Sequence, residues 1–357
     1  EAAEMKKEPY LIYPGNITQM TVLFQLDDTA TCTLEWGTDS HYKTGKIKTT
    51  EFGKDHQHKH TITKLKPGTR YLYRVTINPN KKSIKKTYTG SFRSAPADTA
   101  ENVKFLAYGD TRTYPADHDV VASRMIETFT NDPEFQTFTL HVGDWVGHGD
   151  KEHDWTEQIF SPNRRNIRKM MANLPIQGCM GNHEDDGELY EKYFPYPYLQ
   201  GGRFWSFDYG PAHITVIDQY INFKPGSPQH EWIVKDLSTT KKQWKFLLFH
   251  APGWSAGGHK NKKKVQEYLQ PLCKKYGVSI VFNGHNHYYS HCLVDGVHHL
   301  TVGGGGAPLY DTDPKSENLV KAVKIHHFGE IDIDRNQLSF TARDRNGKVI
   351  DSFAIKR

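Results

Sequence analysis

The sequence lacks the features that mark membrane-spanning, zinc-thiolate and dithiol redox proteins. No stretch approaches the ~18–20 consecutive apolar residues that a membrane helix requires. The chain has only four cysteines, and none shows the CxxC spacing of thiolate zinc sites or redox motifs. A disulfide between Cys273 and Cys292 fits the sequence as well as two buried thiols do.

The basic residues are not arranged as in a nucleic-acid-binding protein. The formal net charge of +5 is spread over lysine clusters such as KTGKIK, KKSIKK and HKNKKK. No interleaved aromatic platform and no groove-reading helix accompanies these clusters. We therefore expect them on solvated turns and helix faces.

The chain does contain enough apolar residues for two ordinary cores. Of its 357 residues, 36% are hydrophobic and 12% are aromatic, and a single core rarely grows beyond about 250–300 residues. Short alternating strands fill the first part, whereas strands alternate with helical patterns after the linker SAPADTAENV. We predict an all-β domain at residues 1–96 and an α/β domain at residues 97–357.

One passage of the predicted β domain is typical of a Greek-key sandwich. LKPGTRYLY places a Pro-Gly turn before an alternating strand that opens with Tyr71, which is the setting of a tyrosine corner. The passage resembles a fibronectin type III-like sandwich. Nearby, His56, His58 and His60 alternate on one face of a predicted strand. For this face an exposed polar surface is favoured over a metal site.

The α/β domain is predicted from strands followed by a glycine turn and a helix. VKFLAYGD precedes the helical pattern HDVVASRMIETF, FTLHVGD precedes a helical stretch near WTEQIF, and the helical pattern KKVQEYLQPLCKKYG precedes VSIVFNGH. FWSFDYG and HITVIDQ are predicted to form a hairpin. The C-terminal segment is predicted to form an antiparallel pair around its Asn-Gly turn.

Polar residues follow five of the predicted strands, at the point where each strand ends. They are Asp110, Asp144, Asn182, His250 and the pair His285 and His287. The carboxyl ends of strands in α/β sheets share one edge, so these side chains are expected to converge in one pocket. Glycine precedes four of them, where it permits a positive φ and a close backbone approach.

These side chains form a mixed set of metal ligands. Carboxylate, carboxamide and imidazole groups together suit iron, manganese or zinc better than calcium. The spacing of His285 and His287 lets their imidazoles serve neighbouring ions.

The ordered motifs GD, GD, GNHE, H and GHNH resemble those of the calcineurin-like metallophosphoesterases. With the β domain in front, the chain is similar to purple acid phosphatases. The resemblance implies a four-layer α/β/β/α sandwich and a dinuclear metal centre. Because paired ions lower the pKa of bound water and stabilise in-line displacement at phosphorus, the resemblance also implies a metal-bound hydroxide nucleophile and no covalent enzyme intermediate. It also implies that Asp144 bridges two ions, with Asp110 and His287 completing the first site. Asn182, His250 and His285 would complete the second.

The sequence departs from the family pattern at the first of these sites. Gly147 stands where purple acid phosphatases have a tyrosine ligand, and Arg112 stands where other members have histidine. The first site is therefore one ligand short. A water molecule fills the position, His118 or His148 substitutes, or the site is weak and sometimes empty.

Two residues beside the ligands are candidates for catalysis. His183 follows Asn182 and is predicted to be the general acid for the leaving oxygen, with Glu184 or Asp185 orienting or charging it. Arg112 is predicted to clamp phosphate oxygens through its planar donors. The alternative for Arg112 is an ion pair with an acidic neighbour such as Asp144 or Asp150.

Four further residues are candidates for the pocket wall that binds substrate. His148, Trp254, Tyr288 and Tyr310 all lie near the motifs, and their rings can stack on a nucleobase or aryl group. A packing role fits each of them equally well.

The leading hypothesis is therefore a metal-dependent hydrolase of phosphate esters, monoesters first, acting on a phosphorylated small molecule. Phosphodiesterase or nucleotide pyrophosphatase activity is the alternative on the same metal core. A non-catalytic binding protein is the alternative of another class. Relatives with this domain order are frequently exported, and EAAEMKKEPY has no apolar signal core. We thus expect a periplasmic or extracellular protein whose signal peptide has been removed; the oligomeric state is not predicted.

Overall fold

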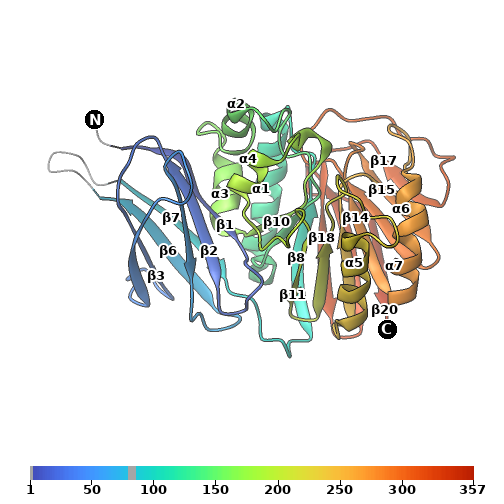
Figure 1. Cartoon of the computed structure of the whole chain (residues 1–357), viewed down its shortest axis with the longest axis horizontal. Coiled ribbons are helices and arrows are strands. Elements are labelled where there is room, and N and C mark those ends of the chain that lie inside the picture. Colours follow the sequence, from blue (N-terminus) through green and yellow to red (C-terminus); the bar gives the residue numbers. More distant parts are fainter. Residues whose placement is uncertain (1–2, 79–85) are drawn as a thin grey trace.

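The computed structural model describes residues 3–78 and 86–357. Residues 81–85 of the lysine cluster KKSIKK lie outside these ranges. In Figure 1 the N-terminal strands lie at the left, further sheets occupy the middle, and helices α6 (Lys263–Tyr268) and α7 (Gln270–Tyr276) lie towards the right. Within the described ranges, no helix is both long and apolar enough to cross a membrane.

Two antiparallel sheets form the N-terminal part of the chain. The first runs in the order β1 (Met5–Ile12), β2 (Met20–Leu26) and β5 (Gln57–Ile62), and the second in the order β4 (Gly45–Thr49), β3 (Cys32–Gly37), β6 (Arg70–Ile77) and β7 (Lys86–Arg93). Alternate residues on both sheets face a shared core that includes Val22, Phe24, Leu34, Val75 and Phe92. The predicted β sandwich is confirmed.

The tyrosine corner is also confirmed, whereas the interpretation of the nearby histidines was wrong. The Tyr71 hydroxyl accepts a hydrogen bond of 2.9 Å from the backbone N–H of Lys66. His58 does not lie on an exposed face: it is fully buried, and its ring stacks on Phe24 at 4.7 Å. Its Nδ1 lies 3.0 Å from the hydroxyl of Thr49. His56 and His60 stay partly exposed, so the expectation fails at His58 alone, and alternation could not show that this middle histidine is covered.

The remaining strands form two sheets. The six-stranded sheet runs in the order β10 (Ile176–Gly178), β9 (Thr139–His141), β8 (Asn102–Tyr108), β18 (His327–Asp334), β19 (Gln337–Asp344) and β20 (Val349–Lys356). The seven-stranded sheet runs in the order β11 (Trp205–Tyr209), β12 (Ala212–Val216), β13 (Trp244–Leu248), β14 (Val278–Asn283), β16 (Val297–Val302), β15 (Tyr289–Val294) and β17 (Leu319–Val323). β8–β10 are parallel in one sheet, and β12, β13, β14 and β16 are parallel in the other.

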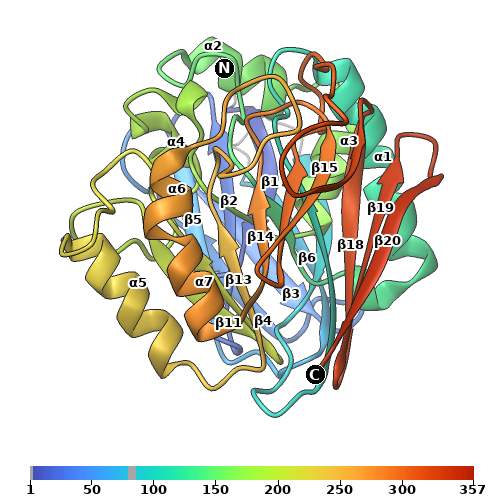
Figure 2. The same ribbon diagram turned by 90° about the vertical axis from the view of Figure 1, so that its right-hand side faces the viewer.

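Helices cover the outer faces of both sheets, which confirms the four-layer α/β/β/α architecture. On the six-stranded side lie α1 (Pro115–Asn131) and α3 (Arg165–Asn173), with the short elements η1 (Pro133–Phe135), α2 (Glu152–Asp154), η2 (Trp155–Ile159), η3 (Asn182–Glu184) and α4 (Glu188–Tyr193) in the connections. On the seven-stranded side lie α5 (Pro228–Thr239), α6 and α7, which stand in front of their sheet in Figure 2. The predicted helices near residues 118–129, 155–160 and 263–277 correspond to α1, η2, and α6 with α7.

Aromatic residues hold the two sheets face to face. Phe105 of β8 meets Phe246 of β13 edge-on with ring centroids 5.5 Å apart, and Phe282 of β14 approaches Phe340 of β19 at 6.5 Å. All four side chains are fully buried in one core. Because the sheets are packed in this way, the carboxyl ends of β8–β10 and of β13 and β14 open towards the same place.

Both predicted hairpins are confirmed. β11 pairs antiparallel with β12, and β19 pairs antiparallel with β20. The second turn places Gly347 at φ 85°, a conformation that glycine adopts without strain. All four cysteines are free and buried, so the Cys273–Cys292 disulfide is absent.

The N-terminal sandwich packs directly on the helical layer. Tyr10, Ile12 and Tyr13 belong to the same buried cluster as residues of α1 and α3, and the Tyr73 hydroxyl donates to the carbonyl of Ala172 at 2.8 Å. The domain boundary that we propose at residues 96 and 97 lies between β7 and β8. The two parts therefore share packing across that boundary.

A buried histidine fastens α5 to the edge of the seven-stranded sheet. On β12, His213 places Nδ1 2.6 Å from Asp208 Oδ1 and Nε2 2.9 Å from Asp236 Oδ2. Burial opposes the charge, but the two carboxylates outweigh it and raise the pKa of His213 to about 9. Its ionic contribution to stability is thus fully present below the unfolded pKa of about 6.5 and is lost as the pH rises through about 9.

We predict that His213→Gln removes this pH dependence. Between pH 6.5 and 9.5 the free energy of unfolding of the wild type should fall by about 1–3 kcal/mol more than that of the variant. Urea titrations at the two pH values measure this difference. The exposed His41→Gln serves as the matched control and should follow the wild type. An equal fall in the His213 variant and the wild type would contradict the assignment.

Candidate metal centre

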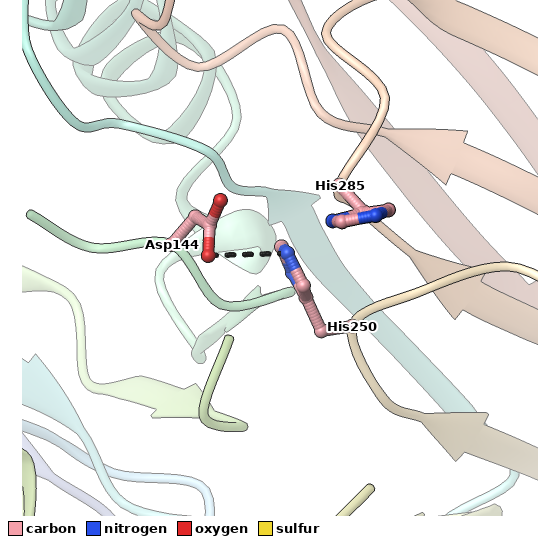
Figure 3. Close-up of side chains that lie close together, drawn as sticks. All are labelled: Asp144, His250 and His285. Carbon is pink, nitrogen blue, oxygen red and sulfur yellow. Dashed lines mark ion pairs between the residues drawn. The ribbon is translucent and has the colours of Figure 1, made fainter. Parts of the chain in front are cut away.

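The six predicted ligand residues come from both sheets. Asp110, Asp144 and Asn182 follow β8, β9 and β10, whereas His250, His285 and His287 follow β13 and β14. Figure 3 shows Asp144, His250 and His285 pointing towards one another from these two directions. The site thus lies where the ends of two sheets meet, not along the edge of a single sheet.

The glycines before these residues serve mainly to allow close approach. A Cβ on Gly181 would lie 2.2 Å from Asp144 Oδ1, and a Cβ on Gly284 would lie 2.1 Å from Asp110 Oδ2. The positive φ angles fall mostly on the ligand residues themselves, with 53° at Asp110, 54° at Asp144 and 69° at His285. Such conformations are strained for residues with side chains and cluster at functional sites.

Asp144, His250 and His285 form one group that could hold a cation, which we call the His250 site. Their ligand atoms lie within 4.8 Å of one another. The Nδ1 of His250 bonds to the Val142 carbonyl at 2.8 Å, which directs Nε2 inward to 3.1 Å from Asp144 Oδ1. This Nε2 is buried and has no hydrogen-bond partner among the described residues. An orphaned, inward-facing imidazole nitrogen beside a carboxylate fits a metal ion.

Asp110, Asp144 and His287 form a second group, which we call the His287 site. His287 Nδ1 bonds to the Pro308 carbonyl at 2.7 Å, and its Nε2 lies 3.5 Å from Asp110 Oδ1. Asp110 Oδ1 also accepts the backbone N–H of His285 at 2.8 Å. Asp144 therefore belongs to both groups, as a bridging ligand must.

Burial sets the protonation of these groups. It lowers the pKa of His285 to about 2 and, together with the charge of Arg112, that of His287 to about 3. Both imidazoles are thus neutral at pH 7 and able to donate lone pairs to a metal. Burial raises the pKa of Asp110 well above its usual range. It also acts to raise the pKa of Asp144, but His250 and then His183 hold that pKa low.

His183 is oriented by a backbone carbonyl and not by Glu184. Its Nδ1 lies 2.7 Å from the Gly147 carbonyl oxygen, and its Nε2 lies 3.9 Å from Asp144 Oδ2. Glu184 is fully buried and accepts backbone N–H groups instead, from Gly181 at 2.6 Å and from Asp144 at 2.9 Å. Asp185 accepts the N–H of Gly149 at 2.9 Å.

Arg112 lies inside the His287 site. Its Nε is 3.5 Å from Asp144 Oδ2, and its Nη2 is 3.5 Å from His287 Nε2. The alternative partner Asp150 pairs with Lys151 at 2.7 Å. The ion pair with Asp144 is therefore the one that forms here.

Neither histidine considered as a replacement ligand is placed among the ligand atoms. His118 Nε2 lies 3.3 Å from the Tyr108 hydroxyl. His148 is largely exposed, and its Nδ1 lies 3.0 Å from Asp154 Oδ2. In the described parts of the chain, neither belongs to a group of side chains that could hold a metal.

The aromatic candidates for the pocket wall occupy different environments. Tyr310 is half-buried and stacks on His287 at 4.2 Å. Trp254 is buried and packs edge-on against His299 at 4.7 Å. Tyr288 is fully buried, and its hydroxyl ties down the loop by donating to Gly257 and accepting from Ala256, both at 2.8 Å. Of the three, Tyr310 contacts a ligand residue.

A cavity of about 400 Å³ opens beside the His250 site. Its lining includes the ligand residues Asn182 and His285, the aromatic residues Tyr220 and Phe223, and the lysines at 262–264. These aromatic residues could not be identified from the sequence, because their loop carries no motif. His259, whose ring stacks on His285 at 4.0 Å, was also missed, although a histidine on the glycine-rich loop after His250 was a usable signal.

Comparison with known proteins agrees with this arrangement. The family model described as calcineurin-like phosphoesterase matches residues 103–289, which is more than half of the chain. The chain belongs to this family. The model of the purple acid phosphatase N-terminal domain matches residues 7–94. The chain thus has a domain of the calcineurin-like phosphoesterase family preceded by a domain of purple acid phosphatase N-terminal type.

The individual proteins to which the chain is similar are named as purple acid phosphatases or acid phosphatases. Purple acid phosphatase 15 of Arabidopsis thaliana is 25% identical over 264 residues, which cover 64% of this chain and 48% of the relative. Acid phosphatase type 7 of Mus musculus is 23% identical, covering 84% of this chain and 77% of the relative. The structure of a purple acid phosphatase from yellow lupin seeds superposes on this chain with a TM-score of 0.78 at 19% sequence identity. The superposition covers 100% of this chain and 74% of the lupin chain, and it supports the fold. The chain spans about half the length of the first plant relatives.

We predict that metal binding stabilises this member of the calcineurin-like phosphoesterase family. After treatment with a chelator, adding Zn²⁺ or Mn²⁺ at ~100 times its dissociation constant should raise the melting temperature by about 3–8 °C. His285→Ala should lose most of this rise, because it removes an imidazole from the His250 site. Differential scanning fluorimetry measures the shift. The control variant His148→Ala should keep the metal-induced rise in melting temperature. If this variant lost the rise, His148 would be a metal ligand.

Proposed function

We propose that this chain hydrolyses phosphate esters, monoesters first, of a phosphorylated small molecule. The observation that carries the proposal is the convergence of Asp110, Asp144 and the imidazoles of three histidines beside an arginine and an oriented histidine. A divalent or trivalent cation bound by such ligands supplies Lewis acidity and activates water at neutral pH. Iron, manganese and zinc all suit the donor set.

In this proposal His183 is the general acid. Because a carbonyl only accepts hydrogen bonds, the 2.7 Å contact with the Gly147 oxygen requires a proton on Nδ1. Nε2 is then the nitrogen free to exchange a proton with the leaving oxygen. This Nε2 lies 3.9 Å from Asp144 Oδ2, on the side of the metal ligands. Glu184 acts as a positioning residue through the backbone.

The cavity beside the His250 site provides room for the leaving group. It adjoins Asn182 and His285 and presents the rings of Tyr220 and Phe223. An aryl or heterocyclic leaving group would stack there while its phosphate lies against the metal ligands. A cavity on one side of the phosphate has room for one organic group, which is what a phosphate monoester carries.

The lysines at the mouth of this cavity favour a second candidate. Lys262, Lys263 and Lys264 are exposed beside the aromatic residues, and their ammonium groups match additional phosphates. Nucleotide pyrophosphatase activity on a nucleoside di- or triphosphate therefore stays the alternative. A non-catalytic binding protein is the alternative of another class, since the similar proteins include purple acid phosphatase 27 of Arabidopsis thaliana, named as probably inactive. The exported location stays a prediction.

Hydrolysis by His183→Ala tests the general acid. Turnover of an alkyl phosphate should fall roughly 10²–10⁴-fold, because its leaving oxygen needs a proton, while an activated aryl phosphate should lose much less. Steady-state assays with both substrates measure the two ratios. Equal losses would argue against proton donation by His183, and no turnover by the metal-loaded wild type would favour the binding protein.

Replacing the three lysines tests the nucleotide candidate. In Lys262→Ala/Lys263→Ala/Lys264→Ala, KM for a nucleoside diphosphate should rise about tenfold, equivalent to about 1.4 kcal/mol, with little change for an aryl monophosphate. The control Lys274→Ala/Lys275→Ala removes exposed lysines of α7 that lie away from the cavity. If both substrates respond equally, the lysines do not select for additional phosphates.

A further inference from the structure

The two ligand groups differ in what lies between their atoms. At the His287 site the Arg112 guanidinium reaches between two of the ligands, with 3.5 Å from Nε to Asp144 Oδ2 and 3.5 Å from Nη2 to His287 Nε2. A metal ion shared by Asp144 and His287 would need the same space. The guanidinium therefore competes with a cation for this site.

Arg112 is held in place by its surroundings. Its side chain is 15% exposed, and its Nε is buried. The preceding residue, Thr111, donates its N–H to the Asp144 carbonyl at 3.0 Å and its hydroxyl to the Trp145 carbonyl at 3.1 Å. The following residue, Thr113, donates its N–H to Gln158 Oε1 at 2.7 Å. The loop thus delivers Arg112 to one position.

No further ligand in the described structure completes the His287 site. The Gly147 carbonyl already bonds to His183, and its N–H bonds to Gln158 Oε1 at 2.9 Å. A Cβ on Gly147 would lie 3.1 Å from Asp154 Oδ2, so the space of the family tyrosine is narrowed by that carboxylate. The second oxygen of Asp110, Oδ2, lies 2.1 Å from where a Cβ on Gly284 would stand and has no hydrogen-bond partner in the described structure. The Asp110 oxygen that comes within 3.5 Å of His287 Nε2 is Oδ1. The residues present therefore do not fit a second tightly bound ion.

Charge balance points the same way. Asp110, Asp144 and Glu184 are the buried carboxyl groups of this region, and the Arg112 guanidinium already lies 3.5 Å from Asp144 Oδ2. One divalent ion at the His250 site and the guanidinium together carry three positive charges, which is the most that these three carboxylates can offset. A second divalent ion would add two positive charges within a few ångströms of the guanidinium, in a site where burial weakens screening.

We propose that the chain binds one metal ion tightly, at the His250 site, and that the Arg112 guanidinium replaces the second cation of the family at the His287 site. The guanidinium matches phosphoryl oxygens with two parallel N–H donors, so it can neutralise their charge from that side. It has no vacant orbital for oxygen and so supplies charge without Lewis acidity. The role towards phosphoryl oxygens rests on the proposed phosphoesterase function; the number of bound ions does not.

The number and coupling of bound ions test the proposal. The full chain is stripped with a chelator, equilibrated with Mn²⁺ and analysed by isothermal titration calorimetry, elemental analysis and electron paramagnetic resonance. We expect one tight ion per chain, with any second ion at least 100-fold weaker, and the six-line spectrum of isolated Mn²⁺. Two ions of affinities within tenfold, with an exchange-coupled spectrum, would overturn the proposal.

Variants at Arg112 make the test independent of a single measurement. Arg112→His removes the charge and adds an imidazole, so it should bind a second Mn²⁺ within tenfold of the first and show the coupled spectrum. Arg112→Ala removes only the charge and should strengthen the second ion at least tenfold relative to the wild type. The matched control Arg112→Lys keeps a positive charge and should bind one ion. A second ion unaffected by all three changes would also overturn the proposal.

Failure of this proposal can be told apart from failure of the proposed function. One ion per chain without turnover of any phosphate ester would leave the arginine replacement intact and remove the phosphoesterase activity. Two coupled ions with turnover would do the reverse. Turnover is measured on the same Mn²⁺-loaded samples.

Discussion

The site depends on one buried carboxylate that binds the backbone of two loops. Glu184 accepts N–H groups of Asp144 and Trp145, at 2.9 and 2.7 Å, and of Gly181 at 2.6 Å. It thereby joins the loop after β9 to the loop after β10. Asp144 is held at a φ of 54°, which an isolated loop would not keep. Asp144, which belongs to both ligand groups, and the general acid candidate, His183, are therefore positioned by the same interaction.

The second constraint is the distance between the two sheets. Aromatic packing sets how far apart the strand ends lie, and the side chains must bridge what remains. Carboxylates from one sheet and imidazoles from the other meet only because Gly181 and Gly284 carry no side chain. A Cβ would lie 2.2 Å from Asp144 Oδ1 at the first glycine and 2.1 Å from Asp110 Oδ2 at the second. A site built across two sheets is consequently sensitive to a single carbon atom added at either glycine. Arg112, in contrast, reaches the site from a loop because its side chain is long.

Local patterns in the sequence predicted most of the fold and the ligand residues. Alternation, glycine turns and polar residues at strand ends are encoded over a few neighbouring residues, so the strand ends at Asp110 and His285 could be identified. What the sequence did not contain is the packing of distant loops. The burial of His58 depends on its neighbour Phe24 in another strand. The Gly147 carbonyl could not be recognised as the partner of His183, since a backbone acceptor has no residue-type signature.

The N-terminal sandwich supports the same site from outside. Lys7 of β1 is fully buried and places Nζ 2.5 Å from Glu152 Oε1, and the Tyr193 hydroxyl donates to the same carboxylate at 2.6 Å. Burial lowers the pKa of Lys7 to about 8, although Glu152 opposes this shift. Two residues further on, Asp154 accepts the N–H of His148 at 2.8 Å. Because moving Glu152 away would leave the buried Lys7 without its partner carboxylate, β1 restrains the loop whose carbonyl orients the general acid candidate. The sandwich is thus part of the scaffold of the site and not an appended module.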